Sequence, residues 1–596
     1  MKHKKQDFRK AKDFKGTLKK LFSYMKNYKW PLIIVVIFAI LSTIFSIIGP
    51  KILGDATTEL FNGLVSKISG GSGIDFEKIA SILTFLIIIY IISAVFSYIQ
   101  GFIMTNITQK TTYRMRKEIS EKINKLPMSY FDKKSHGEVL SIITNDVDTV
   151  SQSLNQGATQ LITSIVTIIG ILVMMLSINI TLTVISFLIL PISLLIIMAV
   201  VKKSQKYFRR NQDYLGHVNG KVEEMYGGHN VIKAFNAEEK MLKGFEEDNK
   251  VLYNSAWKSQ FLSGLMHPIM NFMSNISYVL VAIIGGYLAI QGKITVGNIQ
   301  SFIQYNKNFT MPITQLAQIS NVIQTLIAAS ERIFEFLNEP EEELPKNPIS
   351  IKDVKGNVEF QHVKFGYNSD NIIINDFNAK VKHGQKIAIV GPTGAGKSTM
   401  VKLLMRFYKV NSGKILIDGK NINDIKREDL RHIFGMVLQD TWLFSGTIME
   451  NIRYGRLTAS DDEVIDAAKA ARVHHYIQTQ PESYNMVLNE ETNNISEGQK
   501  QLLTIARAIL ADPKVLILDE ATSNVDTRTE VQIQQAMDKL MENRTSFIIA
   551  HRLSTIKNAD LILVMDKGDI IEQGSHEELL KKDGFYAKLY NSQFEN

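Results

Sequence analysis

Six long apolar runs occupy the first half of the chain, with polar segments between them. A helix of about 20 residues crosses a hydrocarbon core about 30 Å thick, and most of the runs have that length. The pattern therefore predicts six membrane-spanning helices, at Trp30–Ile48, Ile79–Met104, Thr159–Ile178, Ile180–Val201, Met266–Ile290 and Val296–Ile327. Because Gln304–Asn308 interrupt the last run, a long soluble helix is the alternative there.

Positive charge is concentrated in segments that would lie on one side of the membrane. Residues 1–29 hold eleven Lys or Arg against two Asp, and segments 110–134 and 202–258 are also basic. Cytoplasmic loops are enriched in these residues, so we expect a multi-pass plasma-membrane protein with both termini cytoplasmic and no cleavable signal peptide. The net charge of +9 is then explained by anionic membrane lipid rather than by nucleic acid.

The basic N-terminal segment also carries a helical pattern. Apolar residues recur at helical spacing among the lysines, which predicts an amphipathic elbow helix on the membrane surface, at Phe14, Leu18, Leu21, Phe22 and Met25. A basic arm for nucleic acid is the alternative. The chain has no cysteine, which excludes disulfides and thiolate metal sites and fits a reducing compartment.

A proline-punctuated acidic break, Glu339–Pro348, separates this half from a region where short β-rich runs alternate with helical stretches. Compact apolar runs at Lys386–Val390 and Val515–Glu520 are typical of buried parallel strands. The fold class is a membrane α-helical bundle fused to a doubly wound α/β P-loop nucleotide-binding domain. We expect a cytoplasmic segment with the elbow helix at 1–29, a transmembrane domain at 30–338, a linker at 339–356 and the nucleotide-binding domain at 357–596.

The long loops of the transmembrane domain lie only on the cytoplasmic side, with about fifty residues between spans two and three and about sixty between spans four and five. Helices that continue out of the membrane would account for both. Each loop holds a short turn within a helical pattern, at Leu126–Val139 and Gly227–Glu239, where it is expected to dock on a soluble domain.

The clearest chemical motif is GPTGAGKST, Gly391–Thr399, which fits the P-loop pattern between an apolar strand and a helix. Its glycines let the backbone curl around phosphate, Lys397 reaches the β- and γ-phosphates, and the Ser398 hydroxyl coordinates Mg²⁺. A glycine-rich turn without a ligand is the alternative. The residues expected at the phosphates are Gly391, Thr393, Gly394, Gly396, Lys397, Ser398 and Thr399.

Two further sites of chemistry follow strands. The second buried strand ends in consecutive carboxylates, so Asp519 is expected to hold Mg²⁺ and Glu520 to polarise the attacking water. A solvated loop is the alternative for this pair. His551 ends another apolar run, where a γ-phosphate contact and a structural role are both open.

The order of these motifs resembles that of ATP-binding cassette (ABC) transporters, and with six preceding spans the whole chain resembles a half-transporter of the exporter type. The resemblance rests on FGY, the P-loop, VLQD, ISEGQ, LILDEATSNVD and the histidine. It implies that Tyr367 stacks on adenine, that Gln439 contacts Mg²⁺, that Asp526 links two ATP sites, and that His551 contacts the γ-phosphate. The two cytoplasmic loop turns would contain or adjoin coupling helices.

In that family two chains pair head to tail, and each ATP lies between one chain's P-loop and the other chain's signature turn. The usual signature is L-S-G-G-Q. Here Ser496, Gly498 and Gln499 match it, whereas Ile495 and Glu497 depart from it. A carboxylate about 4 Å from a phosphate charge costs roughly 4 kcal/mol at an effective dielectric of about 20. We therefore expect a heterodimer with a different half-transporter, with a homodimer open if Glu497 faces away from the nucleotide.

ATP-driven export of an amphipathic drug-like compound or lipid, with ATP and Mg²⁺ as cofactors, is the leading interpretation. The alternatives are a peptide substrate and an ATP-gated channel or regulatory protein; the spans argue against a nucleic-acid ATPase. A cavity built from the apolar runs would be lined by apolar and uncharged polar side chains, which suit an amphipathic substrate. The candidates for this lining are Met266, Met270, Asn271, Met273, Asn275, Tyr278, Gln304, Tyr305, Asn308 and Gln315, with Pro268 and Pro312 expected to bend their helices. The alternative is that the methionines only pack helix against helix.

Overall fold

The computed structural model describes residues 12–594 except 346, 352, 369–370, 439–440, 490–493, 520–524 and 551–552. The chain forms two compact units. The first contains residues 1–124 and 137–339, and the second contains residues 125–136 and 340–596. The segment Lys125–His136 thus belongs to the second unit, although in the sequence it stands between helices of the first.

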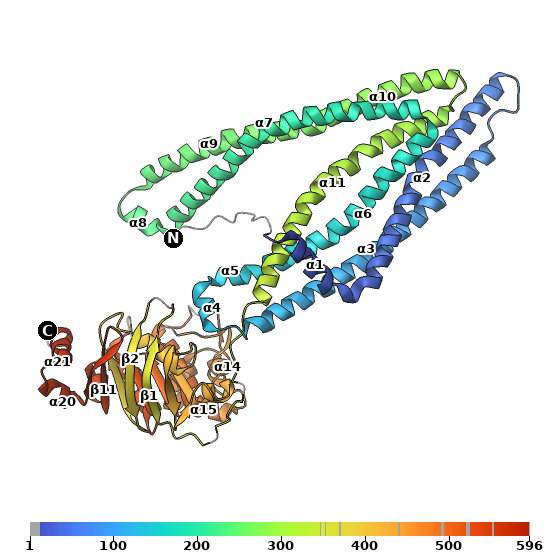
Figure 1. Cartoon of the computed structure of the whole chain (residues 1–596). Coiled ribbons are helices and arrows are strands. Elements are labelled where there is room, and N and C mark those ends of the chain that lie inside the picture. The colour runs from blue at the N-terminus through green and yellow to red at the C-terminus, as the bar shows by residue number, and fades with distance from the viewer. Residues whose placement is uncertain are drawn as a thin grey trace. The chain divides into compact units, whose positions relative to one another are not determined.

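The described residues of the first unit form helices joined by short turns (Figure 1). After α1 (Phe14–Tyr24) and the 3₁₀ turn η1 (Lys26–Tyr28), its long helices are α2 (Lys29–Ile68), α3 (Phe76–Ile123), α6 (Val147–Ile178), α7 (Ile180–Gly227), α9 (Glu238–Gly264), α10 (Met266–Ile290) and α11 (Val296–Leu337). Short elements lie at α5 (His136–Ser141), the π-helical turn η2 (Ile142–Asp146) and α8 (His229–Ala234).

Within the described residues, five helical stretches have the length and apolar composition needed to cross a membrane: Lys26–Ile68, Phe76–Ile123, His136–Ile178, Ile180–Gly227 and Glu238–Ile290. The α11 helix is not among them, and its role as a sixth span stays a prediction. Helices α3 and α7 each run for 48 residues, well beyond the 20 that a membrane requires.

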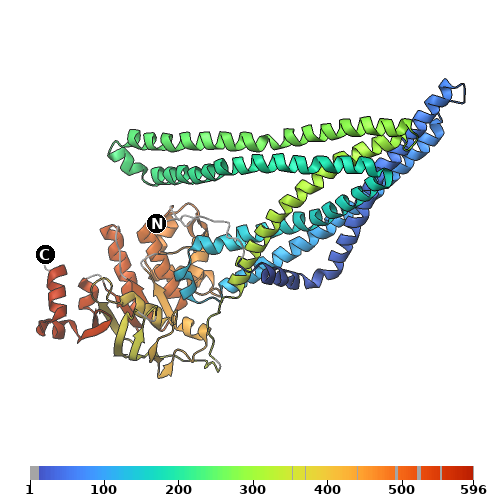
Figure 2. The same ribbon diagram turned by 45° about the horizontal axis from the view of Figure 1, so that its top comes forward.

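Helix α11 nevertheless packs intimately into the bundle. A Cβ atom on Gly54 of α2 would lie 2.5 Å from the Gly297 carbonyl oxygen, so the two backbones approach where both residues lack side chains. Ser301 and Tyr305 of α11 donate hydrogen bonds of 2.8 Å to the carbonyls of Pro50 and Ile47. Figure 2 shows α2, α3, α6 and α11 side by side, as Figure 1 does.

The second unit is built on a six-stranded sheet in the order β12-β11-β3-β10-β9-β6. Its strands are β3 (Lys386–Val390), β6 (Phe434–Val437), β9 (Val515–Asp519), β10 (Thr545–Ile549), β11 (Leu561–Asp566) and β12 (Asp569–Gly574). All neighbours are parallel except β11 and β12. The predicted parallel α/β core is confirmed, and β3 and β9 are nearly fully buried, as their apolar sequences require.

A second, antiparallel sheet that the sequence analysis did not foresee accompanies this core. Its order is β2-β1-β4-β5, with β1 (Val358–Phe365), β2 (Ile374–Val381), β4 (Ser412–Ile417) and β5 (Lys420–Asn421). Strands β7 (Gly446–Thr447) and β8 (Val487–Leu488) pair with each other in a separate two-stranded antiparallel sheet.

The helices of the second unit include the three that carry motif residues: α12 (Lys397–Leu404), α17 (Glu497–Ala511) and α18 (Thr527–Met541). The others are α4 (Met128–Lys133), α13 (Arg427–Ile433), α14 (Ile448–Arg453), α15 (Asp461–Ala470), α16 (His474–Thr479), the 3₁₀ turn η3 (Ser483–Asn485), α19 (Leu553–Lys557), α20 (His576–Lys581) and α21 (Phe585–Phe594).

Candidate active site

The P-loop leaves the buried strand β3 and turns into α12, as its sequence predicts. Gly391 has φ +155°, and a Cβ atom there would lie 2.2 Å from the Met565 carbonyl oxygen of β11. Gly396 caps α12 with φ +101°, a left-handed conformation that glycine adopts without steric cost. The loop therefore needs glycine at both positions to pass the neighbouring strand and enter the helix.

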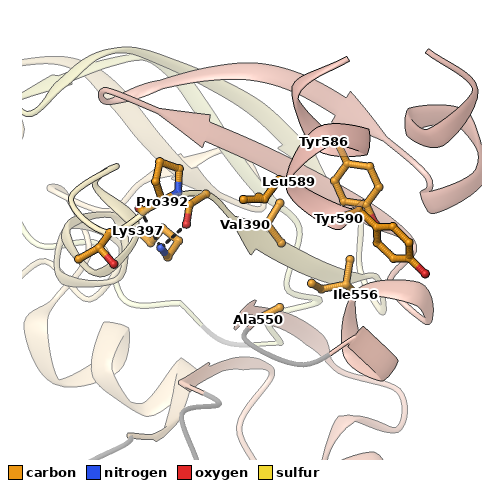
Figure 3. Close-up of a pocket in the computed structure, with 10 residues that line it drawn as sticks. Val390, Pro392, Lys397, Ala550, Ile556, Tyr586, Leu589 and Tyr590 are labelled. Carbon is orange, nitrogen blue, oxygen red and sulfur yellow. Dashed lines mark hydrogen bonds between the residues drawn. The ribbon is translucent and has the colours of Figure 1, made fainter. Parts of the chain in front are cut away.

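Lys397 lies folded back into its own loop. Its Nζ atom donates hydrogen bonds to the carbonyls of Gly391 at 2.7 Å and Pro392 at 3.1 Å, as Figure 3 shows. Burial lowers the pKa of Lys397, and the negative charge of Asp519 opposes that shift. Among the described residues, the hydrogen bonds of this ammonium group go to neutral carbonyls, where phosphate oxygens would satisfy it better.

A pocket of about 140 Å³ opens beside the P-loop. One side is formed by the end of β3, the loop residues 391–393 and Lys397, and the other by Ala550, Ile556 and the C-terminal helix α21 (Figure 3). Tyr586 of α21 lines the pocket, its hydroxyl lies 2.7 Å from His576 Nδ1, and burial raises its pKa to about 12. The sequence analysis missed this wall, although Tyr586 and Tyr590 are spaced four apart on one helix.

Parallel pairing brings the carboxyl ends of β3 and β9, which lead into the motif residues, to the same end of the sheet. Strand β10 lies between β3 and β9, and Ile549 pairs with Asp519. The carboxyl ends of all three strands therefore point the same way, which places Asp519 and the P-loop on the same edge. Three predicted site residues, Gln439, Glu520 and His551, lie outside the described residues, so their positions stay predictions.

The predicted adenine contact Tyr367 lies just beyond β1. Its hydroxyl is 3.4 Å from Thr399 Oγ1 of α12, and its ring is 38% exposed. Thr399 itself is buried, while Ser398 is exposed at the start of the same helix. An exposed Ser398 hydroxyl and the Asp519 carboxylate supply oxygen atoms, the ligands that Mg²⁺ prefers.

The signature turn begins α17, with Ser496 as the N-cap and Gln499 completing a capping box. Glu497 pairs with Lys500 at 2.7 Å; the Glu497 side chain is 62% exposed and that of Lys500 11%. The Glu497 carboxylate therefore lies along its own helix, against a partly desolvated cation. The charge at position 497 therefore has a partner within the chain, and whether Glu497 faces the nucleotide of the opposite chain stays a prediction.

Gly498 is tightly confined, unlike Glu497. A Cβ atom at Gly498 would lie 2.5 Å from Thr529 Cγ2 and 3.0 Å from Val525 Cγ1. Asp526 caps the adjoining helix α18 by accepting a 3.0 Å hydrogen bond from the Thr529 N–H, and that backbone bond lowers the pKa of Asp526. The signature turn and Asp526 thus meet at one packed junction.

The candidate cavity residues of α10 and α11 divide into buried and exposed groups. Met273 is buried, and Tyr305 is 1% exposed with its hydroxyl bonded to Ile47, so both pack helix against helix within this chain. Gln315 accepts a 3.1 Å hydrogen bond from Ser164. The side chains exposed on the single chain are Asn271, Asn275, Tyr278 and Asn308.

The two prolines differ in their setting. Pro312 lies inside α11. Pro268 falls where α9 ends at Gly264 and α10 begins at Met266, and it lacks the N–H that would bond the Gly264 carbonyl. The missing donor accounts for the interruption between these two helices.

Comparison with known proteins assigns both units. Residues 32–313 match the ABC transporter transmembrane region, and residues 374–523 match the ABC transporter domain. The chain is 44% identical to an uncharacterized ABC transporter ATP-binding protein of Bacillus subtilis, over 98% of this chain and 96% of the relative. It is 42% identical to the fatty acid ABC transporter ATP-binding/permease protein of Mycobacterium bovis, over 97% of each chain. It is also 34% identical to the ATP-dependent lipid A-core flippase of Syntrophus aciditrophicus, over 85% of each.

Proposed function

Since the chain belongs to the ABC transporters, as a half-transporter with one transmembrane region and one ATP-binding domain, we propose that it exports an amphipathic small molecule. It is a multi-pass membrane protein that binds ATP and couples its hydrolysis to transport. The P-loop carries the ATP-driven part of this proposal. Its glycines and Lys397 are arranged to bind phosphate, close to the carboxylate of Asp519.

The proposed roles at the ATP site follow the sequence of motifs. Tyr367 stacks on adenine, the P-loop holds the phosphates, Glu520 polarises the attacking water and His551 contacts the γ-phosphate. Mg²⁺, when bound, would neutralise charge on the phosphates, and the oxygens of Ser398, Gln439 and Asp519 would hold it. Ser496, Gly498 and Gln499 contact the ATP of the opposite chain, and Asp526 links the two sites.

We propose a drug-like compound or a lipid as the substrate. Relatives that bear the names of a fatty acid transporter and a lipid A-core flippase support an amphipathic molecule. The exposed side chains of Asn271, Asn275, Tyr278 and Asn308 offer hydrogen bonds on otherwise apolar helices, as a weakly polar ligand needs.

The partner that we propose is a different half-transporter. In a homodimer Glu497 would stand at both composite sites, whereas in a heterodimer it stands only at the site completed by the partner's P-loop. The partner then supplies an unaltered signature to Lys397 and Glu520. The pairing of Glu497 with Lys500 weakens the electrostatic part of this argument but leaves a larger side chain where the usual signature has glycine.

The test is ligand-stimulated ATPase activity in lipid, measured for the chain alone and with candidate half-transporters. We expect little turnover alone, robust turnover in a heterodimer, and stimulation by fatty acids or amphipathic drugs. Flat responses to every amphipathic compound would refute the proposed substrate class. A homodimer that hydrolyses ATP and transports at full rate would refute the heterodimer.

A transport assay in sealed vesicles separates transport from a channel or regulatory role. A transporter should move labelled substrate into sealed vesicles only with hydrolysable ATP, with both termini on the ATP side. Substrate flux that persists with a non-hydrolysable ATP analogue would favour a gated channel.

A further inference from the structure

Four side chains from separate parts of the second unit meet beside the P-loop helix: Asp132, Tyr367, Lys402 and Tyr408. Asp132 lies on α4, in the segment Lys125–His136. Tyr367 follows β1, and Tyr408 follows α12. The segment is also tied to this unit by its backbone, because the Glu342 N–H donates a 2.9 Å hydrogen bond to the Lys125 carbonyl.

Lys402 occupies the centre of this cluster. It lies on α12, and its Nζ atom is 5.6 Å from the centroid of the Tyr367 ring and 5.8 Å from that of Tyr408. Both distances fall within the range of a cation–π interaction. The same ammonium group lies 3.4 Å from an oxygen of Asp132. One carboxylate therefore fixes the cation that faces both rings.

Tyr408 receives a second contact from the same carboxylate, since its hydroxyl donates a hydrogen bond to Asp132. Burial raises the pKa of Tyr408, and the Asp132 carboxylate raises it further, so the phenol stays protonated and remains a donor at neutral pH. Asp132 thus orients Lys402 and Tyr408 together.

These two groups define one side of the Tyr367 ring. The Tyr367 and Tyr408 rings meet edge to face, with centroids 5.0 Å apart and planes at 87°. Tyr367 is held further by its hydroxyl contact with Thr399 on the P-loop helix and by an edge-to-face contact with the Phe365 ring, with centroids 5.1 Å apart. The orientation of the Tyr367 ring is therefore set by β1 and α12 together with the contacts that Asp132 fixes.

We propose that Asp132 is a positioning residue for nucleotide, which acts through Lys402 and Tyr408 to hold Tyr367 in the orientation that stacks on adenine. The inference rests on the proposed role of Tyr367. It concerns binding alone: Asp132 touches no phosphate and no reacting atom, so its loss weakens ATP binding while the chemistry at saturating ATP continues. By linkage, bound nucleotide in turn stabilises the docked position of the segment Lys125–His136.

The test measures the Kd of Mg-ATP for the full chain in lipid nanodiscs, and the KM and kcat of the assembled transporter. Asp132→Ala and Lys402→Met should each raise Kd and KM about 5- to 10-fold, which lies within the range of one partly desolvated cation–π contact. The kcat should stay within twofold of the wild type. Asp132→Asn, which still accepts from Tyr408, should have a smaller effect.

Lys409→Met is the matched control. Lys409 is an exposed cation close in sequence to Lys402, and it pairs with the exposed Glu343 at 3.1 Å instead of with Asp132. Its removal should leave Kd unchanged. Combining Asp132→Ala with Lys402→Met should raise Kd by less than the product of the two single effects, because Asp132 acts in part through Lys402.

Three results would overturn the inference, and they are distinguishable. If Tyr367→Ala weakens Mg-ATP binding tenfold while Asp132→Ala leaves Kd within twofold, Tyr367 is positioned without Asp132. A fall in kcat with unchanged Kd and KM would show that Asp132 only docks its segment. If Tyr367→Ala itself leaves Kd unchanged, the proposed adenine contact is wrong and the inference falls with it.

Discussion

Substitution of Gly498 by alanine tests whether the signature turn depends on its packing against α18. In an open helix the change would stabilise, because glycine costs up to about 1 kcal/mol relative to alanine. Here the added Cβ atom would lie 2.5 Å from Thr529 Cγ2 and 3.0 Å from Val525 Cγ1. Both neighbours are β-branched and stiff at χ1, so the backbone has to shift.

The crowding outweighs the helix propensity. Overpacking of this kind costs about 1–3 kcal/mol. We therefore expect Gly498→Ala to destabilise by about 1–2 kcal/mol, which lowers the apparent Tm of a domain of this size by roughly 2–8 °C. ATPase turnover at the site that this signature completes should fall as well, because the N-terminus of α17 moves.

The structure supplies a rescue and a control for this experiment. Thr529→Ser removes the crowding methyl group and keeps the hydroxyl, so the double variant Gly498→Ala, Thr529→Ser should recover at least half of the lost Tm. Glu497→Ala is the control, because its exposed side chain leaves room for a methyl group. Equal Tm values for Gly498→Ala and Glu497→Ala, or a failed rescue, would refute the packing argument.

Three further predictions test other contacts. Lys397→Ala should weaken ATP binding itself, and unchanged affinity in a binding assay would contradict its role in the P-loop. Glu520→Gln should retain ATP affinity but lose at least nine-tenths of turnover, a barrier increase of about 1.4 kcal/mol or more; a smaller loss in an ATPase assay would exclude Glu520 as the group that polarises water. Arg332→Met leaves Asp146, 7% exposed, without its 2.8 Å hydrogen bond, and should destabilise by about 2 kcal/mol in thermal unfolding. Lys12→Met, at an exposed pair with Glu335, should change stability by less than about 1 kcal/mol, and equal losses would contradict this reasoning.

The parts of the site that sequence could predict are local. Strand β3, the P-loop and α12 follow one another within about twenty residues, so apolar periodicity and glycine spacing suffice to predict them. The same holds for Ser496 as an N-cap, because the capping box needs only the residue three positions later. Such contacts depend on few residues and little on the rest of the fold.

The contacts that sequence could not predict join distant segments. Asp132 and Tyr408 are 276 positions apart, and nothing in either neighbourhood marks the other as its partner. Tyr586 reaches the P-loop pocket only because β11 lies beside β3 and carries the chain back to that edge. The pairing of β1 with β4 in the antiparallel sheet was missed for the same reason, because β2, β3 and α12 lie between these two strands in the sequence.

The local ion pair between Glu497 and Lys500 changes the electrostatic argument for a heterodimer. A lone carboxylate in the signature turn would repel the phosphate of the opposite chain's ATP, and that repulsion favours a heterodimer. Lys500 stands three positions further along the helix and holds the carboxylate at 2.7 Å, so at distances well beyond this separation the two charges largely cancel. What remains at position 497 is bulk and a hydrogen-bonding group where the usual signature has only backbone. The case for the proposed heterodimer therefore rests on the space that the Glu497 side chain would take up at the proposed composite site, and the charge at this position matters only if ATP binding separates it from Lys500.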